Sequence, residues 1–140
     1  MQVFHDIRSA LEYTVRELVA ARHTFIINIR GPREVKRRWA CTVQLVAESM
    51  IFDSDERGLT LDLVFDLTSR SAKSRFRKFA AIPFCKQFNT YEFDGMPCFA
   101  MRFGTDVDMA LTVIQFVLTK LWGYPESTVF ECGVSDEGPD

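Results

Sequence analysis

Glycine and proline are scarce in this sequence, with 7 and 5 occurrences among 140 residues, and it contains no internal repeat or low-complexity segment. This scarcity excludes a fibrous or low-complexity disordered chain, because such chains are much richer in these two residues. With 47% hydrophobic and 26% charged residues, the composition is that of an ordinary globular protein. We therefore expect a single domain over residues 1–134, followed by a flexible C-terminal tail over 135–140.

Long apolar runs are also missing. Lys120 interrupts the best candidate, so no stretch reaches the roughly 18 to 20 apolar residues that cross a bilayer. The first residues lack the basic region and the unbroken apolar run of a signal peptide. Wide spacing without a C-x-x-C pair favours free thiols at all four cysteines, Cys41, Cys85, Cys98 and Cys132. These features predict a cytoplasmic protein without a membrane span.

No catalytic or metal-binding motif occurs in the sequence. A glycine-rich phosphate loop and a G-x-S-x-G elbow are absent, and His5 and His23 lie too far apart to form a ligand pair at helical spacing. The acidic segment 53–56 lacks the spacing of a calcium loop and is interpreted as a solvated turn. Cys85 follows a basic segment and is the one candidate nucleophile, although a loop thiol is the simpler interpretation. The sequence therefore predicts no catalytic residue, metal or cofactor, and a small enzyme that uses Cys85 stays a minor alternative.

The spacing of apolar residues predicts the secondary structure. Apolar residues recur at intervals of three and four, as in amphipathic helices, in the segments 4–22, 68–83 and 105–122. They alternate with polar residues, as in half-buried strands, in the segments 24–30, 39–52 and 59–66, and in a hairpin over 89–104. The hairpin turns at Asp94-Gly95, a pair that favours tight turns. The segment 127–134 can form one more edge strand.

The order of these elements predicts the fold class. It runs helix, three strands, helix, two strands, helix, with the further strand at the end. Short connections between successive strands favour antiparallel pairing, because parallel strands need long crossover connections. We therefore expect an α+β fold, in which helices pack on one face of an antiparallel sheet of about five to six strands.

This element order resembles that of the small secretion chaperones, the dimeric acidic proteins of type III secretion that bind effector proteins. The resemblance spans roughly residues 3–122. It is based on the succession of "FHDIRSALEYTVREL", "TFIINIR", "LTLDLVFD", "FDGMPCFAMRFG" and "DMALTVIQFVLTKL", and on the chain's size and pI of about 5.7. It implies a homodimer that binds a client polypeptide, and it assigns no functional residue.

Basic residues are concentrated in two regions, although the formal net charge of the chain is −2. One region is 30–38 and the other is 70–86, within a stretch that has no acidic residue between Asp66 and Glu92. If the two regions meet in space, they form a positive patch that can bind an anion, a nucleic acid or an acidic protein surface. The residues expected in such a patch are Arg37, Arg38, Arg70, Lys73, Arg77 and Lys78. A solvated helix face is the simpler interpretation.

The last predicted helix, over 105–122, is apolar on more than one side. One broad apolar face suits packing on the sheet, and Met109, Val113 and Phe116 form a second stripe on nearly the opposite side. The first helix, a second copy of the chain or a client polypeptide can cover this stripe. We therefore expect a non-enzymatic protein-binding module, chaperone-like or adaptor-like and homodimeric, that uses these three residues. Binding of an anion or a nucleic acid through the two basic regions is the alternative.

Overall fold

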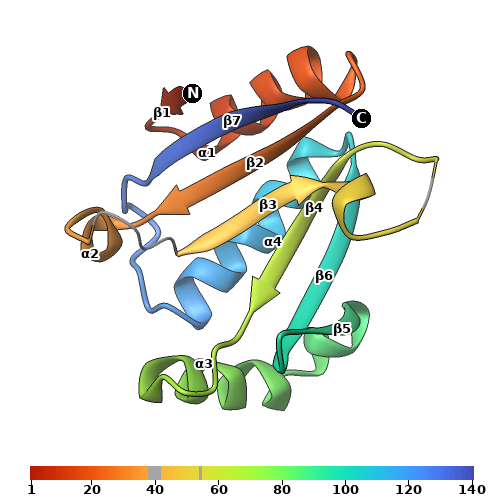
Figure 1. The fold of residues 1–140 in the computed structure, drawn as a ribbon. Coiled ribbons are helices and arrows are strands. Elements are labelled where there is room, and N and C mark those ends of the chain that lie inside the picture. The colour runs from red at the N-terminus through yellow and green to blue at the C-terminus, as the bar shows by residue number, and fades with distance from the viewer. Residues whose placement is uncertain (38–41, 54) are drawn as a thin grey trace.

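A computed structural model describes residues 1–37, 42–53 and 55–140 (Figure 1). Its centre is one seven-stranded sheet in the order β1-β7-β2-β3-β4-β6-β5, in which every neighbouring pair is antiparallel. The strands are β1 (Gln2–Phe4), β2 (His23–Arg30), β3 (Val43–Ala47), β4 (Leu59–Val64), β5 (Asn89–Phe93), β6 (Met96–Gly104) and β7 (Glu131–Pro139). The predicted α+β class with an antiparallel sheet is confirmed, with seven strands instead of five to six.

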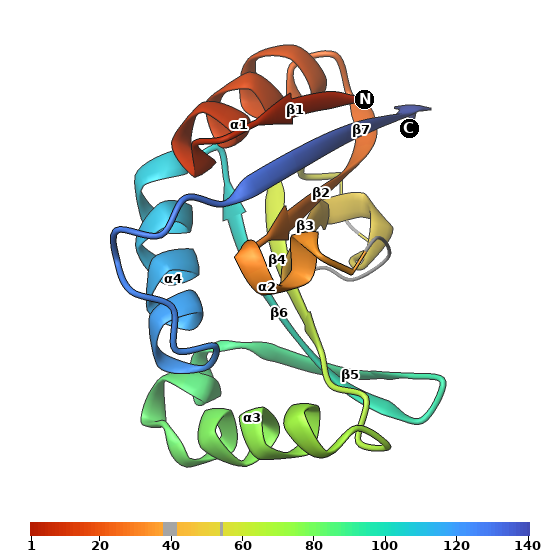
Figure 2. The same ribbon diagram turned by 90° about the vertical axis from the view of Figure 1, so that its left-hand side faces the viewer.

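The helices complete the fold. The longer ones are α1 (Ile7–Tyr13) with its π-helical continuation η1 (Thr14–Val19), α3 (Arg70–Ala81) and α4 (Val107–Lys120). The shorter ones are α2 (Pro32–Val35), η2 (Glu48–Met50) and η3 (Pro83–Gln87). Figure 2 shows α1 and α4 on the same side of the sheet, while α3 lies beyond the end of β4. In the described residues, no helix is both long and apolar enough for a membrane span, and the compartment stays a prediction.

The core lies between the sheet and these helices. One row of side chains crosses four strands, because Ile27 pairs with Leu45, Leu45 with Leu61, and Leu61 with Met101. All four are buried in the core together with the inward face of α4. This face carries the i, i+3, i+4 spacing that predicted the helix. The alternation seen in the sequence thus turns one side of each strand toward the helices.

The aromatic stripe of α3 packs on the same core. The ring of Phe79 lies 4.9 Å from that of Phe99 and 5.7 Å from that of Phe65, centroid to centroid. Phe76 contacts the same two rings at 6.0 and 5.5 Å. The stripe of α3 therefore faces inward, as its spacing predicted, and leaves the basic residues of this helix on its other sides.

The two ends of the chain differ from the prediction. Residues 2–4 form β1 instead of the start of the first helix, which begins at Ile7 with the Asp6 carboxylate capping the amide of Ser9 at 3.0 Å. The prediction of a flexible tail over 135–140 is wrong, because residues up to Pro139 belong to β7. The strand is also not an edge strand, because it lies between β1 and β2.

Candidate functional site

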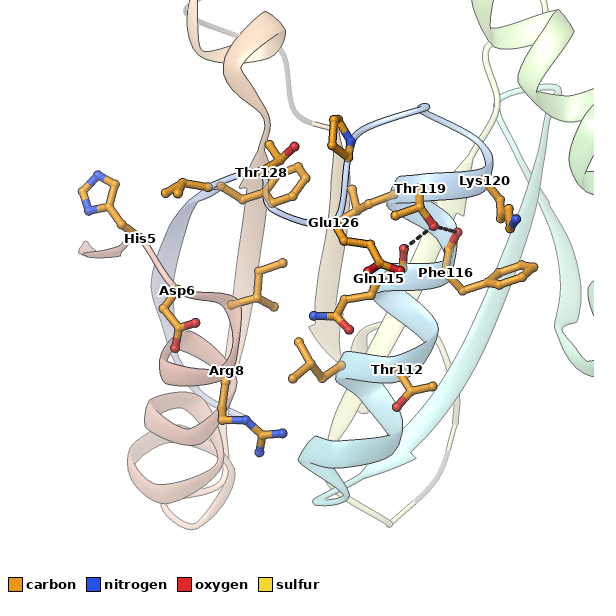
Figure 3. Close-up of a pocket in the computed structure, with 16 residues that line it drawn as sticks. His5, Asp6, Arg8, Thr112, Gln115, Phe116, Thr119, Lys120, Glu126 and Thr128 are labelled. Carbon is orange, nitrogen blue, oxygen red and sulfur yellow. Dashed lines mark hydrogen bonds between the residues drawn. The ribbon is translucent and has the colours of Figure 1, made fainter.

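A groove of about 740 Å³ lies between the start of α1, the outer side of α4 and the segment that leads into β7. We call it the α1–α4 groove. Its lining residues are His5, Asp6, Ile7, Arg8, Leu111, Thr112, Gln115, Phe116, Leu118, Thr119, Lys120, Pro125, Glu126, Thr128, Val129 and Phe130. Figure 3 shows α1 on one side of the groove and α4 on the other, with Gln115 pointing toward α1. The lining is mixed, since apolar, amide, hydroxyl and charged groups of both signs are present.

Several of the polar groups at this groove already have partners in the chain. Arg8 joins α1 to α4 through an ion pair with Asp108, 2.8 Å between Nη1 and Oδ1, and it also lies 3.7 Å from Glu12. The hydroxyls of Thr112 and Thr119 each donate to a backbone carbonyl of the preceding turn of α4. The groove is therefore close to charge balance, and its surface suits a ligand that is itself partly polar and partly apolar.

The three predicted partner-binding residues do not share one surface. Val113 belongs to the core and is 6% exposed. Met109 is 46% exposed and does not line the groove. Phe116 lines the groove, but its ring points away from α1 (Figure 3) and meets the ring of Phe84 in η3 at 5.4 Å. Contact of a partner with Met109 or with Phe116 stays a prediction.

A second hollow of about 430 Å³ lies where the two basic regions meet. We call it the basic notch. Its lining residues are Arg33, Glu34 and Arg37 in and after α2, Ser71, Ser74, Arg75 and Lys78 on α3, and Leu121 and Trp122 after α4. The basic regions are therefore adjacent in space, which is the condition for a positive patch.

The position of α2 is determined by contacts with Tyr124. A Cβ on Gly31 would lie 2.3 Å from the Tyr124 ring, so only glycine allows this approach. The Tyr124 hydroxyl accepts from the amide of Arg33 at 3.1 Å and donates to the Glu34 carboxylate at 3.0 Å. The same Glu34 oxygen accepts from the amide of Gly31 at 3.2 Å and from the hydroxyl of Thr42. These bonds hold the short helix, and with it Arg33 and Arg37, against the end of α4.

Two cations of the notch, Arg33 and Arg75, contact uncharged groups. The Arg33 guanidinium donates to the carbonyl of Trp122 at 2.5 Å and lies 4.3 Å from the centroid of the Tyr124 ring. Arg75 lies 4.9 Å from the centroid of the Trp122 ring. Burial lowers the pKa of Arg75 and the charge of Arg33 lowers it further, while the charge of Glu34 opposes both. Within the described part of the chain, no cation of the notch forms an ion pair with a carboxylate.

The expected anion-binding residues divide between two sides of α3. Lys78 lines the notch and so does Arg37, whereas Arg70, Lys73 and Arg77 do not. At about 100° per residue, Ser71, Ser74 and Lys78 lie on one side of the helix. Arg70, Lys73 and Arg77 lie together on another side. Arg38 lies outside the described residues. Sequence reasoning missed Arg33, Arg75 and Trp122 as site residues. The helical spacing of Arg75 and Lys78 was the available signal for Arg75.

A smaller hollow of about 180 Å³ adjoins the notch and shares Arg75 and Trp122 with it. Asp62 also lines this hollow, and the Tyr91 hydroxyl donates to its Oδ1 at 2.5 Å. Burial raises the pKa of the Asp62 carboxyl, and the hydrogen bond from Tyr91 opposes that effect. Burial also raises the pKa of Tyr91, so its hydroxyl stays a donor at neutral pH.

The remaining candidates for chemistry are isolated. Cys85 is partly buried and its thiol donates to the carbonyl of Ala80 at 3.6 Å. His23 is paired with Asp136, 3.0 Å from Nδ1 to Oδ1, while the ring of His5 stands at the rim of the groove (Figure 3). No group of three potential metal ligands occurs in the described ranges. The described cysteines Cys85, Cys98 and Cys132 are free, and Cys41 lies outside those ranges.

No family model, curated protein or solved structure matches the chain. The resemblance to secretion chaperones therefore stays a prediction based on element order.

Proposed function

We propose that the protein is a non-enzymatic binding module that takes a short extended segment of another polypeptide in the α1–α4 groove. The single observation that carries this proposal is the groove itself, about 740 Å³ with a mixed lining. A polypeptide offers the matching chemistry, because it carries backbone amides and carbonyls together with apolar and charged side chains. The client binding implied by the chaperone-like element order supports the same conclusion.

The dimensions of the groove suit this ligand. The lining residues of α4 run from Leu111 to Lys120, which is about 14 Å along the helix axis at 1.5 Å per residue. An extended chain of about four residues covers that length at roughly 3.3 Å per residue. Leu111, Val129 and Pro125 supply apolar contact area, and Gln115 offers an amide to the backbone of the guest. A guest of this kind would bind by contact along its length and not through one deep anchor.

Two matched variants of α4 test this proposal. Peptides are first selected from a random library on the immobilised wild-type protein, and their affinities are then measured by calorimetry. Gln115→Arg places a long cation in the groove and should weaken peptide binding by about tenfold or more, because it blocks contacts and adds a charge that must be desolvated. Met109→Arg adds the same side chain on the same helix outside the groove lining, and it should leave the affinity unchanged.

The reverse pattern, with Met109→Arg abolishing binding and Gln115→Arg harmless, would place the partner on the stripe predicted from the sequence. A wild type that selects no peptide would refute the proposal. The predicted homodimer is tested separately by sedimentation equilibrium of the wild type. A strict monomer at high concentration would exclude the homodimer and leave the peptide proposal standing.

A further inference from the structure

The basic notch has an excess of positive charge among its lining residues. Four of its lining residues are cations, Arg33, Arg37, Arg75 and Lys78, and one is an acid, Glu34. The acceptor oxygen of Glu34 is occupied by the hydrogen bonds that hold α2, including those from Tyr124 and Gly31. Like charges held together in a partly enclosed hollow repel one another, so a site of this composition costs stability in the absence of an anion.

The hydrogen-bond donors that line the notch come from two parts of the chain. Arg33 and Arg37 come from α2 and the residue pair after it, while Arg75 and Lys78 come from one side of α3. The hydroxyls of Ser71 and Ser74 lie on that same side of α3. Guanidinium groups donate two parallel hydrogen bonds to a phosphate, and a lysine adds a point charge. A volume of about 430 Å³ is that of a small-molecule site.

We propose that the basic notch binds a small ligand through a phosphate or pyrophosphate group. The arginines bind the oxyanion from the α2 and α3 sides, Lys78 adds charge at the rim, and the serine hydroxyls supply neutral donors. This site is separate from the α1–α4 groove and does not depend on peptide binding there.

A small phosphate fits the notch better than a nucleic acid does. Nucleic-acid binding needs cations spread along a surface that follows the phosphate backbone, and it would use both flanks of α3. The notch instead gathers cations of α2 and α3 in one hollow, and the aromatic rings nearby are already covered. Arg75 lies over Trp122 and Arg33 lies over Tyr124, so neither pair offers two open faces for stacking bases.

Two adjacent residues of α3 provide a matched test. Lys78→Ala and Arg77→Ala remove the same charge from neighbouring exposed positions, and only Lys78 lines the notch. Calorimetric titration with inorganic pyrophosphate at low ionic strength should show binding to the wild type. Lys78→Ala should weaken it by about tenfold, as expected for one charge-assisted hydrogen bond. Arg77→Ala should change it by less than about twofold, because a solvent-screened charge on the other flank contributes little.

Further ligands and a second variant identify the source of the phosphate. Inorganic phosphate, a nucleoside diphosphate and a single-stranded oligonucleotide are titrated in parallel with pyrophosphate. Among the three small phosphates, the one that binds most tightly defines the class of small ligand. Arg75→Gln should abolish pyrophosphate binding and lower the melting temperature only slightly, since it removes the contact with the Trp122 ring but no ion pair among the described residues.

The proposal is wrong if the wild type binds none of the small phosphates. It is also wrong if Arg77→Ala and Lys78→Ala weaken binding equally, since that result shows general attraction to a basic helix. An oligonucleotide that binds more tightly than pyrophosphate, and that both variants weaken, would identify a nucleic-acid surface instead. Gln115→Arg should leave pyrophosphate binding unchanged, so a failure of the peptide proposal and a failure of this one are distinguishable.

Discussion

The α1–α4 groove and the basic notch both border α4, but they differ in how their charges are used. In the groove, the principal cation Arg8 is paired with Asp108 and Glu12, so the charges contribute to holding α1 beside α4. In the notch, Arg33 and Arg75 rest on aromatic rings and a carbonyl. Paired charges at a surface stabilise a structure slightly, whereas unpaired charges in a hollow are a feature of binding sites.

The difference shows why charge composition alone was a poor guide to the site. Both hollows contain cations, and α3 carries basic residues on two flanks. In the notch, acidic lining residues are few, and Arg33 and Arg75 contact aromatic rings and a carbonyl instead of acids. The distinction depends on which residues face each other across elements, which the count of basic residues does not reveal.

The largest effect is expected at Val113, which belongs to neither hollow. Val113→Asp buries an unpaired carboxylate in the core and should lower the free energy of unfolding by about 3–5 kcal/mol, measured by urea denaturation. Met109→Asp is the control on the same helix, and it should have little effect because Met109 is exposed. A Val113→Asp protein that stays fully stable but changes its solution mass would show that this side chain lies at an interface.

An intermediate effect is expected at Gly31, and it should separate the two hollows. Gly31→Ala forces Tyr124 and α2 apart, which should cost about 1–3 kcal/mol and weaken pyrophosphate binding while peptide binding persists. Tyr124→Phe is the companion variant, because it keeps the ring and removes only the hydroxyl hydrogen bonds to Arg33 and Glu34. Unchanged stability and unchanged pyrophosphate affinity in Gly31→Ala would mean that the position of α2 does not determine the geometry of the notch.

The smallest effect is expected at Asp62, next to the notch, and it depends on pH. Because burial raises the folded-state pKa of this carboxyl, the folded protein keeps the proton to higher pH than the unfolded chain does. The stability contributed by Asp62 is therefore greatest below the unfolded pKa of about 3.9 and is lost as the pH rises through the folded value. Asp62→Asn should match or exceed the wild type in stability at pH 7, and the difference should shrink toward pH 4.

Thermal melts of both proteins across this pH range measure that difference. If Asp62→Asn is instead destabilised at pH 7 and not at pH 4, the ionised carboxylate is needed in the fold. Asp62 would then compensate the charge of Arg75, which lines the same small hollow, and the contrast between the groove and the notch would be weaker.

Much of the fold could be predicted because the signals are local. The alternation around Ile27, Leu45 and Leu61 predicted three strands, and these residues form one buried row. The pair Asp94-Gly95 predicted the turn between β5 and β6, where both residues have positive φ. These features depend on residues a few positions apart, so they can be predicted from the local amino-acid pattern.

The candidate site was predicted only in part. Of the residues expected in a patch if the two basic regions are adjacent, Lys78 and Arg37 line the notch, whereas Arg70, Lys73 and Arg77 do not. The flank of α3 that faces α2 depends on how the Phe79 side of the helix packs against the sheet. That choice is a tertiary one, and it determines which of the helix's cations line the notch.

The sequence by itself determined the class of fold, the antiparallel pairing and the inward faces of the strands and helices, because side-chain periods of two and of three to four residues are local properties. The tertiary structure alone decided that "SDEGP" joins a strand, since these poor strand formers pair with β2 through contacts such as His23 with Asp136, 113 positions apart. It also decided that α2 and α3 meet at Trp122 and Tyr124, since such long-range proximity is set by the packing of the whole chain.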